Sequence, residues 1–319
     1  MKVFVMILIS FFLTGSGPIW AAPASDYPKK AVDLVVPFEA GGGTDVKARV
    51  YAKLLAEKWG KPVNVVNRPG GNTVIGTNYV MKAAPDGYTI LKDGAGSCSL
   101  IMGMKDLPFK VEERTFIYGA DNQPGVFVVS AESPWKNLKD VVSAAQKDPD
   151  KFTWASLGGG SSADLQMSLF FATTGIPVGK TKKVTFNGAN PACVAIAGGH
   201  VQFGAAGANS ALSLVRGGKL RAVAITSDKR IEQLPDTATT AEQGFPKVNT
   251  IYWGGFSGPP GLPDSIVRVW GQTLEELHKD PKVIAQLAKL VIIPMNLGPA
   301  EFKKFALAEG EWVMKLLGK

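Results

Sequence analysis

The chain has 319 residues, with 35 Lys and Arg against 27 Asp and Glu, and a formal net charge of +8. This length suffices for two domains that each bury a hydrophobic core. The basic residues are scattered singly or in pairs, such as Lys29-Lys30 and Lys182-Lys183, and no basic block is interleaved with aromatic residues. Scattered charge is typical of a solvated surface, so the composition argues against nucleic acid as a partner.

The first 24 residues have the organisation of a secretory signal peptide. Lys2 precedes an apolar run over residues 3–13, which ends at a Gly-Ser-Gly-Pro break and is followed by small residues up to Ala24. The run is much shorter than the roughly 20 apolar residues that span a bilayer, which argues against a retained anchor. We therefore expect export to the periplasm, with cleavage after Ala21 or, as we favour, after Ala24.

Short β-branched segments then alternate with helical patterns, and this alternation predicts parallel βαβ units. In the first helix, Val46, Val50 and Leu54 form an apolar stripe, with Tyr51 and Leu55 beside them. A glycine at position 60 is expected to end this helix, and a Pro-Asp-Gly turn at 85–87 leads into the third strand. The expected strands cover residues 31–36, 63–66 and 88–91, and the expected helices cover residues 45–59 and 76–83.

A second series of strands begins after the turn at residues 123–125. The Gly- and Pro-rich stretch 253–261 interrupts the pattern again, and the chain is then mainly helical up to Leu317. We interpret the interruptions as two crossings between lobes, near residues 120 and 252. The prediction is a two-lobed α/β fold with a mainly parallel sheet in each lobe. Residues 25–120 with 252–319 would form lobe 1, and residues 121–251 would form lobe 2. The expected strands of lobe 2 cover residues 126–129, 152–155, 184–186, 201–203 and 220–226.

Four turns are rich in Gly, Ser, Thr or Asn, and each lies where a strand should lead into a helix. Glycine lets the backbone approach a ligand, and free N–H groups at a helix start attract anions. A single turn of this kind is an ordinary βα connection. Four of them, divided between two lobes at the carboxyl ends of strands, indicate an anion site between the lobes. The turns cover residues 37–45, 70–73, 158–162 and 187–191.

Catalytic and metal-binding motifs are incomplete. Residues 158–163 fit G-x-G-x-x-A, but no acidic residue follows about 20 positions later to bind a ribose, and neither a P-loop nor a G-x-S-x-G motif occurs. Only His200 and His278 are present, both expected at the surface or at a helix end, so we expect no metal and no cofactor. Cys98 and Cys193 could form one bridge only with Cα atoms within about 7 Å, and we expect two unpaired, buried thiols.

Several individual residues have two interpretations. Asp45 and Arg49 are four apart at a helix start, which favours an ion pair within the helix, whereas the alternative has Asp45 orient the Gly-rich loop or meet a ligand donor. Phe38 and Trp253 could form a wall of the ligand site or fill the core. Glu39 is unexpected at an anion site unless it points away or is bridged by water.

Motifs along essentially the whole mature chain resemble the tripartite tricarboxylate transporter substrate-binding proteins, also called Bug receptors. The strongest markers are Asn-Arg-Pro-Gly at 67–70 and Ala-Pro-Asp-Gly-Tyr-Thr at 84–89, with further matches at 37–45, 48–49, 76–77 and 259–263. The resemblance implies a two-lobed periplasmic binding protein of the Venus-flytrap type. Its ligand would be a dicarboxylate, a tricarboxylate, an acidic amino acid or an aromatic acid, held by backbone N–H groups and bridging waters.

The chain departs from the family pattern at three positions, so the resemblance does not carry over a ligand preference. Asp164 and Ala195 stand where the family often has histidine and aspartate, and Glu39 stands at a position that is usually small or apolar. The family also implies that two membrane transporter proteins, or a sensor, receive the ligand.

We therefore predict a non-catalytic, monomeric periplasmic receptor that captures a small organic anion for an inner-membrane transporter. The alternative is a periplasmic hydrolase that acts on a carboxylate or ester, with Ser161 or Ser162 as nucleophile, although no nearby His motif supplies a base. The predicted ligand-binding residues are Phe38, Ala40, Gly41, Gly42, Thr44, Asp45, Asn72, Thr73, Ser97, Gly160, Ser161, Ser162, Asn187, Gly188, Ala189 and Gly207.

Overall fold

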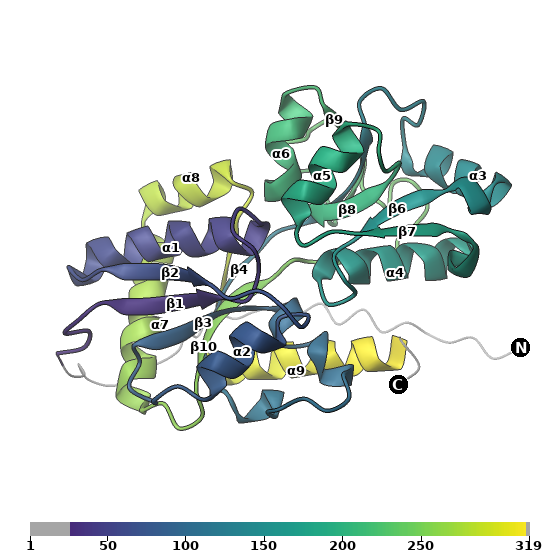
Figure 1. The fold of residues 1–319 in the computed structure, drawn as a ribbon. Coiled ribbons are helices and arrows are strands. Elements are labelled where there is room, and N and C mark those ends of the chain that lie inside the picture. The colour runs from purple at the N-terminus through teal and green to yellow at the C-terminus, as the bar shows by residue number, and fades with distance from the viewer. Residues whose placement is uncertain (1–25, 317–319) are drawn as a thin grey trace, which may run out of the picture.

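Two α/β lobes lie side by side in the computed structural model, which describes residues 26–316 (Figure 1). The predicted signal peptide at residues 1–24 lies outside the described residues. Within those residues, no helix is both long and apolar enough to cross a membrane. The two lobes confirm the predicted α/β fold class. The sheets are not mainly parallel, as was expected, because most of their strand pairs run antiparallel.

Lobe 1 contains a six-stranded sheet in the order β11-β4-β10-β3-β1-β2. β1 pairs in parallel with β2 and β3, whereas β10 runs antiparallel to both of its neighbours and β11 runs antiparallel to β4. The sheet is thus mixed, with β1, β2, β3 and β4 in one direction. The strands are β1 (Val32–Val36), β2 (Val63–Asn67), β3 (Thr89–Gly94), β4 (Thr115–Asn122), β10 (Gly254–Gly258) and β11 (Ile293–Leu297).

Helices cover both faces of this sheet. Tyr51 of α1 packs edge-on against Phe256 of β10, and Phe256 in turn contacts Trp270 of α7. All three side chains are fully buried, so this cluster forms the centre of the lobe 1 core. Phe302 of α9 packs on the opposite face against Phe116. The helices are α1 (Gly43–Trp59), α2 (Val74–Met81), α7 (Asp264–Lys279), α8 (Pro281–Lys289) and α9 (Pro299–Leu316).

The glycine-rich stretch 253–261 was expected to interrupt the pattern, but it contains β10, an interior strand of the sheet. Side chains here would collide with their neighbours: a Cβ at Gly254 would lie 2.7 Å from Asp121 Oδ1, and one at Gly255 would overlap the ring of Phe302. Close packing therefore requires glycine in a strand position, which removes the β-branched signal. The edge strand β11 was also missed, because it is short, half-exposed and interrupted by Pro294.

Lobe 2 is built around a three-stranded sheet in the order β8-β5-β9, with a parallel β6-β7 pair beside it. β5 runs antiparallel to both neighbours. The strand expected at 201–203 is found at Gly204–Gly207, where the small residues allow Ile196 to pack closely. The elements are β5 (Gly125–Ser130), α3 (Leu138–Lys147), β6 (Thr153–Ser156), α4 (Ser162–Thr174), β7 (Lys182–Thr185), α5 (Ala189–Ala197), β8 (Gly204–Gly207), α6 (Ala208–Arg216) and β9 (Leu220–Thr226).

The chain passes between the sheets twice, and the two crossing segments lie side by side. Tyr252 N donates to the carbonyl oxygen of Gln123 at 2.8 Å, and Pro124 forms a β-bridge with Ile251. The C-terminal helix also connects the lobes, because Val313 of α9 is buried in the same hydrophobic cluster as Phe127 of lobe 2. Figure 1 shows α9 extending from beneath the first sheet towards α4. The predicted lobe boundaries, at residues 120 and 252, remain a prediction.

His278 was expected at the surface or at a helix end, and the surface expectation is wrong. It lies in the last turn of α7 but is buried, with Nε2 2.9 Å from Tyr51 Oη and Nδ1 2.6 Å from Asn296 Oδ1. Burial lowers its pKa. Cys98 and Cys193 are both buried and unpaired, as expected, and burial raises the pKa of Cys193 to about 12.

Candidate functional site

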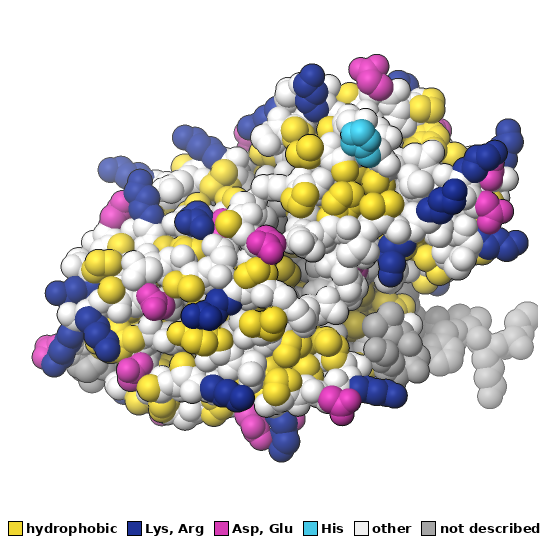
Figure 2. Space-filling model, viewed as in Figure 1, with side chains coloured by type: hydrophobic (Ala, Val, Ile, Leu, Met, Phe, Trp, Pro, Cys, Tyr) yellow, Lys and Arg dark blue, Asp and Glu magenta, His cyan; other side chains and the backbone are white. Residues whose placement is uncertain are grey.

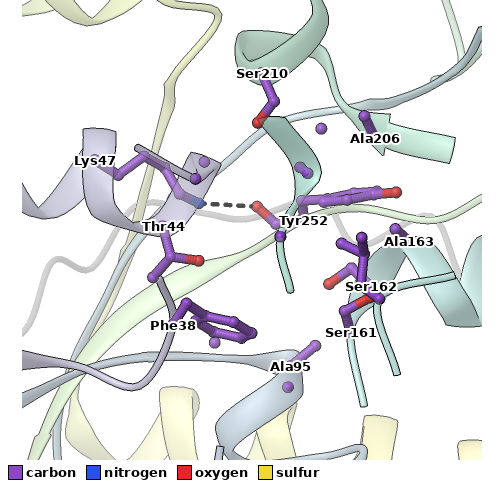
Figure 3. A pocket seen from close by; sticks show the side chains of 18 of the residues that line it. Phe38, Thr44, Lys47, Ala95, Ser161, Ser162, Ala163, Ala206, Ser210 and Tyr252 are labelled. Carbon is purple, nitrogen blue, oxygen red and sulfur yellow. Dashed lines mark hydrogen bonds between the residues drawn. The ribbon is translucent and has the colours of Figure 1, made fainter. Parts of the chain in front are cut away.

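A cavity lies between the two lobes, with about 780 Å³ of empty space when its open mouth is included. Lobe 1 supplies the β1–α1 loop and residues 94–96, and lobe 2 supplies the starts of α4, α5 and α6. The crossing residues Gln123, Tyr252 and Trp253 complete the wall. Figure 3 shows Thr44 and Phe38 on one side of the space and Ser161 and Ser162 on the other.

Four helices begin at this cavity. The first turns of α1, α4, α5 and α6 all contribute lining residues. Because the first four N–H groups of a helix have no partner within it, each start presents free donors and a partial positive charge. Some of these donors are already bound, since Asp164 N donates to Ser161 Oγ and Asn209 N donates to Gln123 Oε1. The remaining donors make the cavity wall suited to an anion.

Lys47 adds a full positive charge to this wall. Its Nζ lies 2.5 Å from Asp121 Oδ1 and donates to the carbonyl oxygen of Tyr252 at 3.1 Å, the bond drawn in Figure 3. Asp121 Oδ2 also accepts from Lys92 Nζ at 2.6 Å, and all three charged side chains are buried. Two ammonium groups therefore share one carboxylate, so this cluster carries a formal charge of +1 at the cavity.

Two of the three groups in this cluster, Lys92 and Asp121, have shifted pKa values. Burial lowers the pKa of Lys92 to about 8, although the adjacent carboxylate of Asp121 partly opposes this shift. Burial alone would raise the pKa of Asp121, but the charges of Lys47 and Lys92 outweigh it and lower that pKa to about 2. The carboxylate is thus ionised at neutral pH, and Lys92 is mostly protonated there.

Lys47 was not among the predicted ligand-binding residues. The buried face of α1 contains Lys47, Ala48, Tyr51 and Leu55, whereas the stripe predicted from Val46 is turned by about one residue. A lysine at helical spacing from Tyr51 and Leu55, inside an otherwise apolar face, was the available signal. Long charged side chains are rarely buried without a partner, and that partner, Asp121, lies 74 positions further along the chain, beyond the reach of any local pattern.

Asp45 pairs with Arg49 and orients the Gly-rich loop, but it does not line the cavity. Its carboxylate accepts from Gly41 N at 2.8 Å and from Arg49 Nε at 2.9 Å, and Asn67 Nδ2 donates to Oδ1 at 2.9 Å. Burial opposes ionisation, but the bonds from Arg49, Gly41 and Asn67 prevail and lower the pKa of Asp45. Gly41 has φ of +82°, which only glycine adopts easily, so Asp45 and Gly41 together set the shape of the loop.

The structure brings most of the predicted ligand-binding residues to the cleft between the lobes. Nine line the main cavity, and Asn72, Thr73 and Gly160 line an adjoining compartment. Ala40, Gly41, Asp45 and Ser97 line neither space. The nine are Phe38, Gly42, Thr44, Ser161, Ser162, Asn187, Gly188, Ala189 and Gly207.

Ser97 is buried behind the cavity wall. Its hydroxyl donates to Asp93 Oδ1 at 2.6 Å, and Asp93 is paired with Arg114 at 2.8 Å. Arg114 in turn donates to the carbonyl oxygen of Ser97 at 2.9 Å. This buried network holds residues 94–96 against the cavity, so Ser97 supports the wall without facing the space inside it.

Ser161 has the contacts of a helix cap. Its hydroxyl donates to Asp164 Oδ2 at 2.6 Å and accepts from Asp164 N at 3.2 Å, and the residue is 6% exposed. The same carboxylate accepts from Ser156 Oγ at 2.6 Å. No histidine is among the described residues that line the cavity, so neither Ser161 nor Ser162 has an imidazole base beside it.

The lobes touch across the cleft at several points. Asn190 Nδ2 donates to the carbonyl oxygen of Gly41, and Asn209 Nδ2 donates to that of Gly43 at 3.3 Å. A Cβ at Gly96 would lie 2.6 Å from the carbonyl oxygen of Gly160, so the backbones of the two lobes approach closely there. The two lobes are therefore in direct contact beside Gly43 and Gly96, which line the cavity.

Trp253 and Phe38 were each expected either to fill the core or to form a wall of the ligand site. Each of them packs into the core and also lines the cavity. Trp253 is 3% exposed and packs edge-on against Phe302, yet it lines the cavity, and its Nε1 donates to Glu309 Oε2 at 2.5 Å. Phe38 packs against the lobe 1 core and faces the cavity beside Ala95 (Figure 3).

Comparison with known proteins shows what this arrangement is. The sequence profile described as "Tripartite tricarboxylate transporter family receptor" matches residues 47–316. Protein BugT of Bordetella pertussis is 30% identical over 309 residues, which cover 96% of this chain and 94% of BugT. The solved periplasmic binding protein BugD is 27% identical with a TM-score of 0.84, and a protein of R. palustris solved with adipate is 27% identical with a TM-score of 0.86. Both comparisons cover 92% of this chain and 99% of the other. The chain therefore belongs to the family of tripartite tricarboxylate transporter receptors, the Bug proteins.

Proposed function

We propose that this receptor binds a small organic anion in the cavity between its lobes, with a carboxylate of the ligand beside Lys47. The observation that carries the proposal is the shared carboxylate of Asp121, which leaves one positive charge of Lys47 and Lys92 uncompensated at the cavity wall. A buried charge without a counter-ion is unfavourable, and a carboxylate in the cavity would neutralise it. Charge-assisted hydrogen bonds of this kind contribute about 1.5–3 kcal/mol each.

The four helix starts support the same ligand chemistry. Residues of their first turns line the same cavity as Lys47, and the N-terminal ends of helices stabilise negative charge. The adipate bound to the R. palustris relative is a carboxylate as well. The candidate ligands are dicarboxylates, tricarboxylates, acidic amino acids and aromatic acids.

Ligand binding is proposed to close the two lobes, residues 25–120 with 252–319 and residues 121–251, about the paired crossings. A ligand can favour the closed state only if it contacts both lobes there, and the cavity offers residues of both. Closure would create the form that an inner-membrane transporter recognises. The protein would work as a monomer after removal of its signal peptide near Ala21 to Ala24.

The test is a melting-temperature screen of the mature protein against mono-, di- and tricarboxylates, amino acids, sugars and cations. A ligand at a hundredfold excess over its Kd stabilises the folded state by about 2.7 kcal/mol, which such a screen detects. A response to sugars or cations alone, with none to carboxylates, would refute the proposal. The hydrolase alternative makes the opposite prediction for a turnover assay, since it requires the consumption of an ester or acid.

A further inference from the structure

A second compartment of the cleft adjoins the main cavity and differs from it chemically. Four residues, Phe38, Glu39, Leu157 and Asn187, line both spaces, so the two spaces are adjacent and share one side. The main cavity contains Lys47 and the helix starts, whereas no Lys or Arg is among the described residues that line the second compartment. The remaining lining residues of that compartment are Pro37, Pro69, Gly70, Gly71, Asn72, Thr73, Gly158, Gly160, Thr185 and Phe186.

Glu39 is the acidic residue in both linings, and it is exposed. Among residues 26–316, its carboxylate takes part in no hydrogen bond and no ion pair, in contrast to Asp45 and Asp164, which are fully bonded nearby. Figure 2 shows most Lys and Arg side chains of this face of the molecule towards the outer ends of the two lobes. An unpaired carboxylate in the lining of the cleft attracts a cation.

Two aromatic rings accompany this carboxylate. Phe38 and Phe186 come from opposite lobes, both half-buried, and both line the second compartment. The face of an aromatic ring attracts an ammonium group, and the attraction strengthens when water is excluded. A compartment lined by one carboxylate and two phenyl rings therefore favours a positively charged nitrogen, while Lys47 in the main cavity favours a carboxylate.

We propose that the ligand is a zwitterion, with its carboxylate beside Lys47 and a cationic nitrogen beside Glu39, Phe38 and Phe186. This inference rests on the proposed function, because it keeps the carboxylate beside Lys47 and specifies the group at the other end of the ligand. A dicarboxylate in the same pose would place its second negative charge beside Glu39, where like charges repel. Glu39 is thus the residue that determines the preference for the distal group of the ligand.

The test compares acids that differ only at the distal end. Glutarate and γ-aminobutyrate have three methylene groups each, and adipate and δ-aminovalerate have four. Isothermal titration calorimetry on the mature protein should give the amino acid of at least one pair an affinity about tenfold higher than that of the diacid. An exposed ion pair alone contributes up to about fivefold, and repulsion of the diacid acts in the same direction.

Two variants remove the same charge in different places. Glu39→Gln should abolish the preference or reverse it in favour of the diacid. Glu57→Gln is the control, because Glu57 is exposed on the last turns of α1 and lines neither compartment, so this variant should keep the wild-type preference. The trimethylammonium analogue of γ-aminobutyrate should also bind, since the rings of Phe38 and Phe186 favour quaternary nitrogen.

The possible failures separate the two proposals. If diacids bind more tightly than amino acids and Glu39→Gln changes neither affinity, the zwitterion inference is wrong and the carboxylate site stands. If Glu39 only complements the start of α5, which faces it across the cleft, Glu39→Gln should lower the melting temperature without changing the preference, and the inference is again refuted. If no carboxylate of either kind binds, the proposed function itself fails.

Discussion

Replacing Lys47 by methionine tests the charge on which the proposed anion site depends. Methionine has a similar length and no charge, so the variant removes the ammonium group with little change in packing. A ligand carboxylate would lose one charge-assisted contact, which contributes about 1.5–3 kcal/mol and corresponds to a factor of about 10–150 in Kd. The affinity for the tightest-binding acid of the carboxylate panel should fall by that factor.

The stability of the Lys47→Met variant should change much less than its affinity. Removing one partner of a buried ion pair usually costs about 3–5 kcal/mol, because the other charge is left unpaired. Here Asp121 keeps Lys92 at 2.6 Å, so the remaining pair is neutral and the free energy of unfolding should stay within about 1 kcal/mol of the wild type. Asp121→Asn, by contrast, leaves two buried ammonium groups without a counter-ion and should be strongly destabilising.

Calorimetric titration gives the affinities, and urea unfolding gives the stabilities. Lys53→Met is the matched control. Lys53 lies on the same helix, but it is 71% exposed, and its ion pair with Glu57 is long, at 3.9 Å. It should bind as the wild type does. Unchanged affinity in a folded Lys47→Met variant would show that this ammonium group does not contact the ligand.

Three further outcomes follow from the structure. The pKa of Lys92 is about 8 in the folded protein and 10.5 in an ordinary lysine. Between pH 8 and 10.5, Lys92 is therefore protonated in the unfolded chain and deprotonated in the folded protein. The free energy of unfolding should therefore rise as the pH increases from about 8 to 10.5, while the affinity for an anion falls. Gly96→Ala should force residues 94–96 away from Gly160. In saturating ligand, small-angle scattering should therefore show that the variant is less compact than the wild type. Val313→Ala should lower the free energy of unfolding by about 2 kcal/mol, since this residue of α9 is 2% exposed in the core of the other lobe.

Each outcome has a contrary result. Affinity that stays constant between pH 7 and 10 would show that Lys92 does not act on the ligand. Gly179→Ala, where a Cβ would meet nothing within 4 Å, controls for the added methyl group, and equal compaction of the Gly96 variant would place the closing contact elsewhere. A Val313→Ala protein as stable as the wild type would mean that α9 does not hold the lobes together.

The sequence by itself determined the two-lobed α/β architecture, the family and the position of the cleft. Alternating β-branched and amphipathic segments predict strands and helices because such patterns record which faces of each element are buried. Glycine-rich turns at the carboxyl ends of strands mark the sheet edge where ligands bind. These features are local, so they can be read within a window of about ten to twenty residues.

Only the tertiary structure decided where the charges of the site lie and which glycines are strand residues. Lys47 and Tyr252 form a hydrogen bond at the cavity although they stand 205 positions apart. Lys92 and Asp121, which complete the cluster, come from the strands β3 and β4. The pairing that leaves one ammonium group uncompensated therefore depends on how α1, β3, β4 and the second crossing pack together. In the same way, β10 consists largely of small residues because Asp121 and Phe302 occupy the space where its side chains would extend. The hydrophobic pattern of a segment shows which of its faces is buried. It does not show which residues cover that face, so contacts between distant segments cannot be predicted from it.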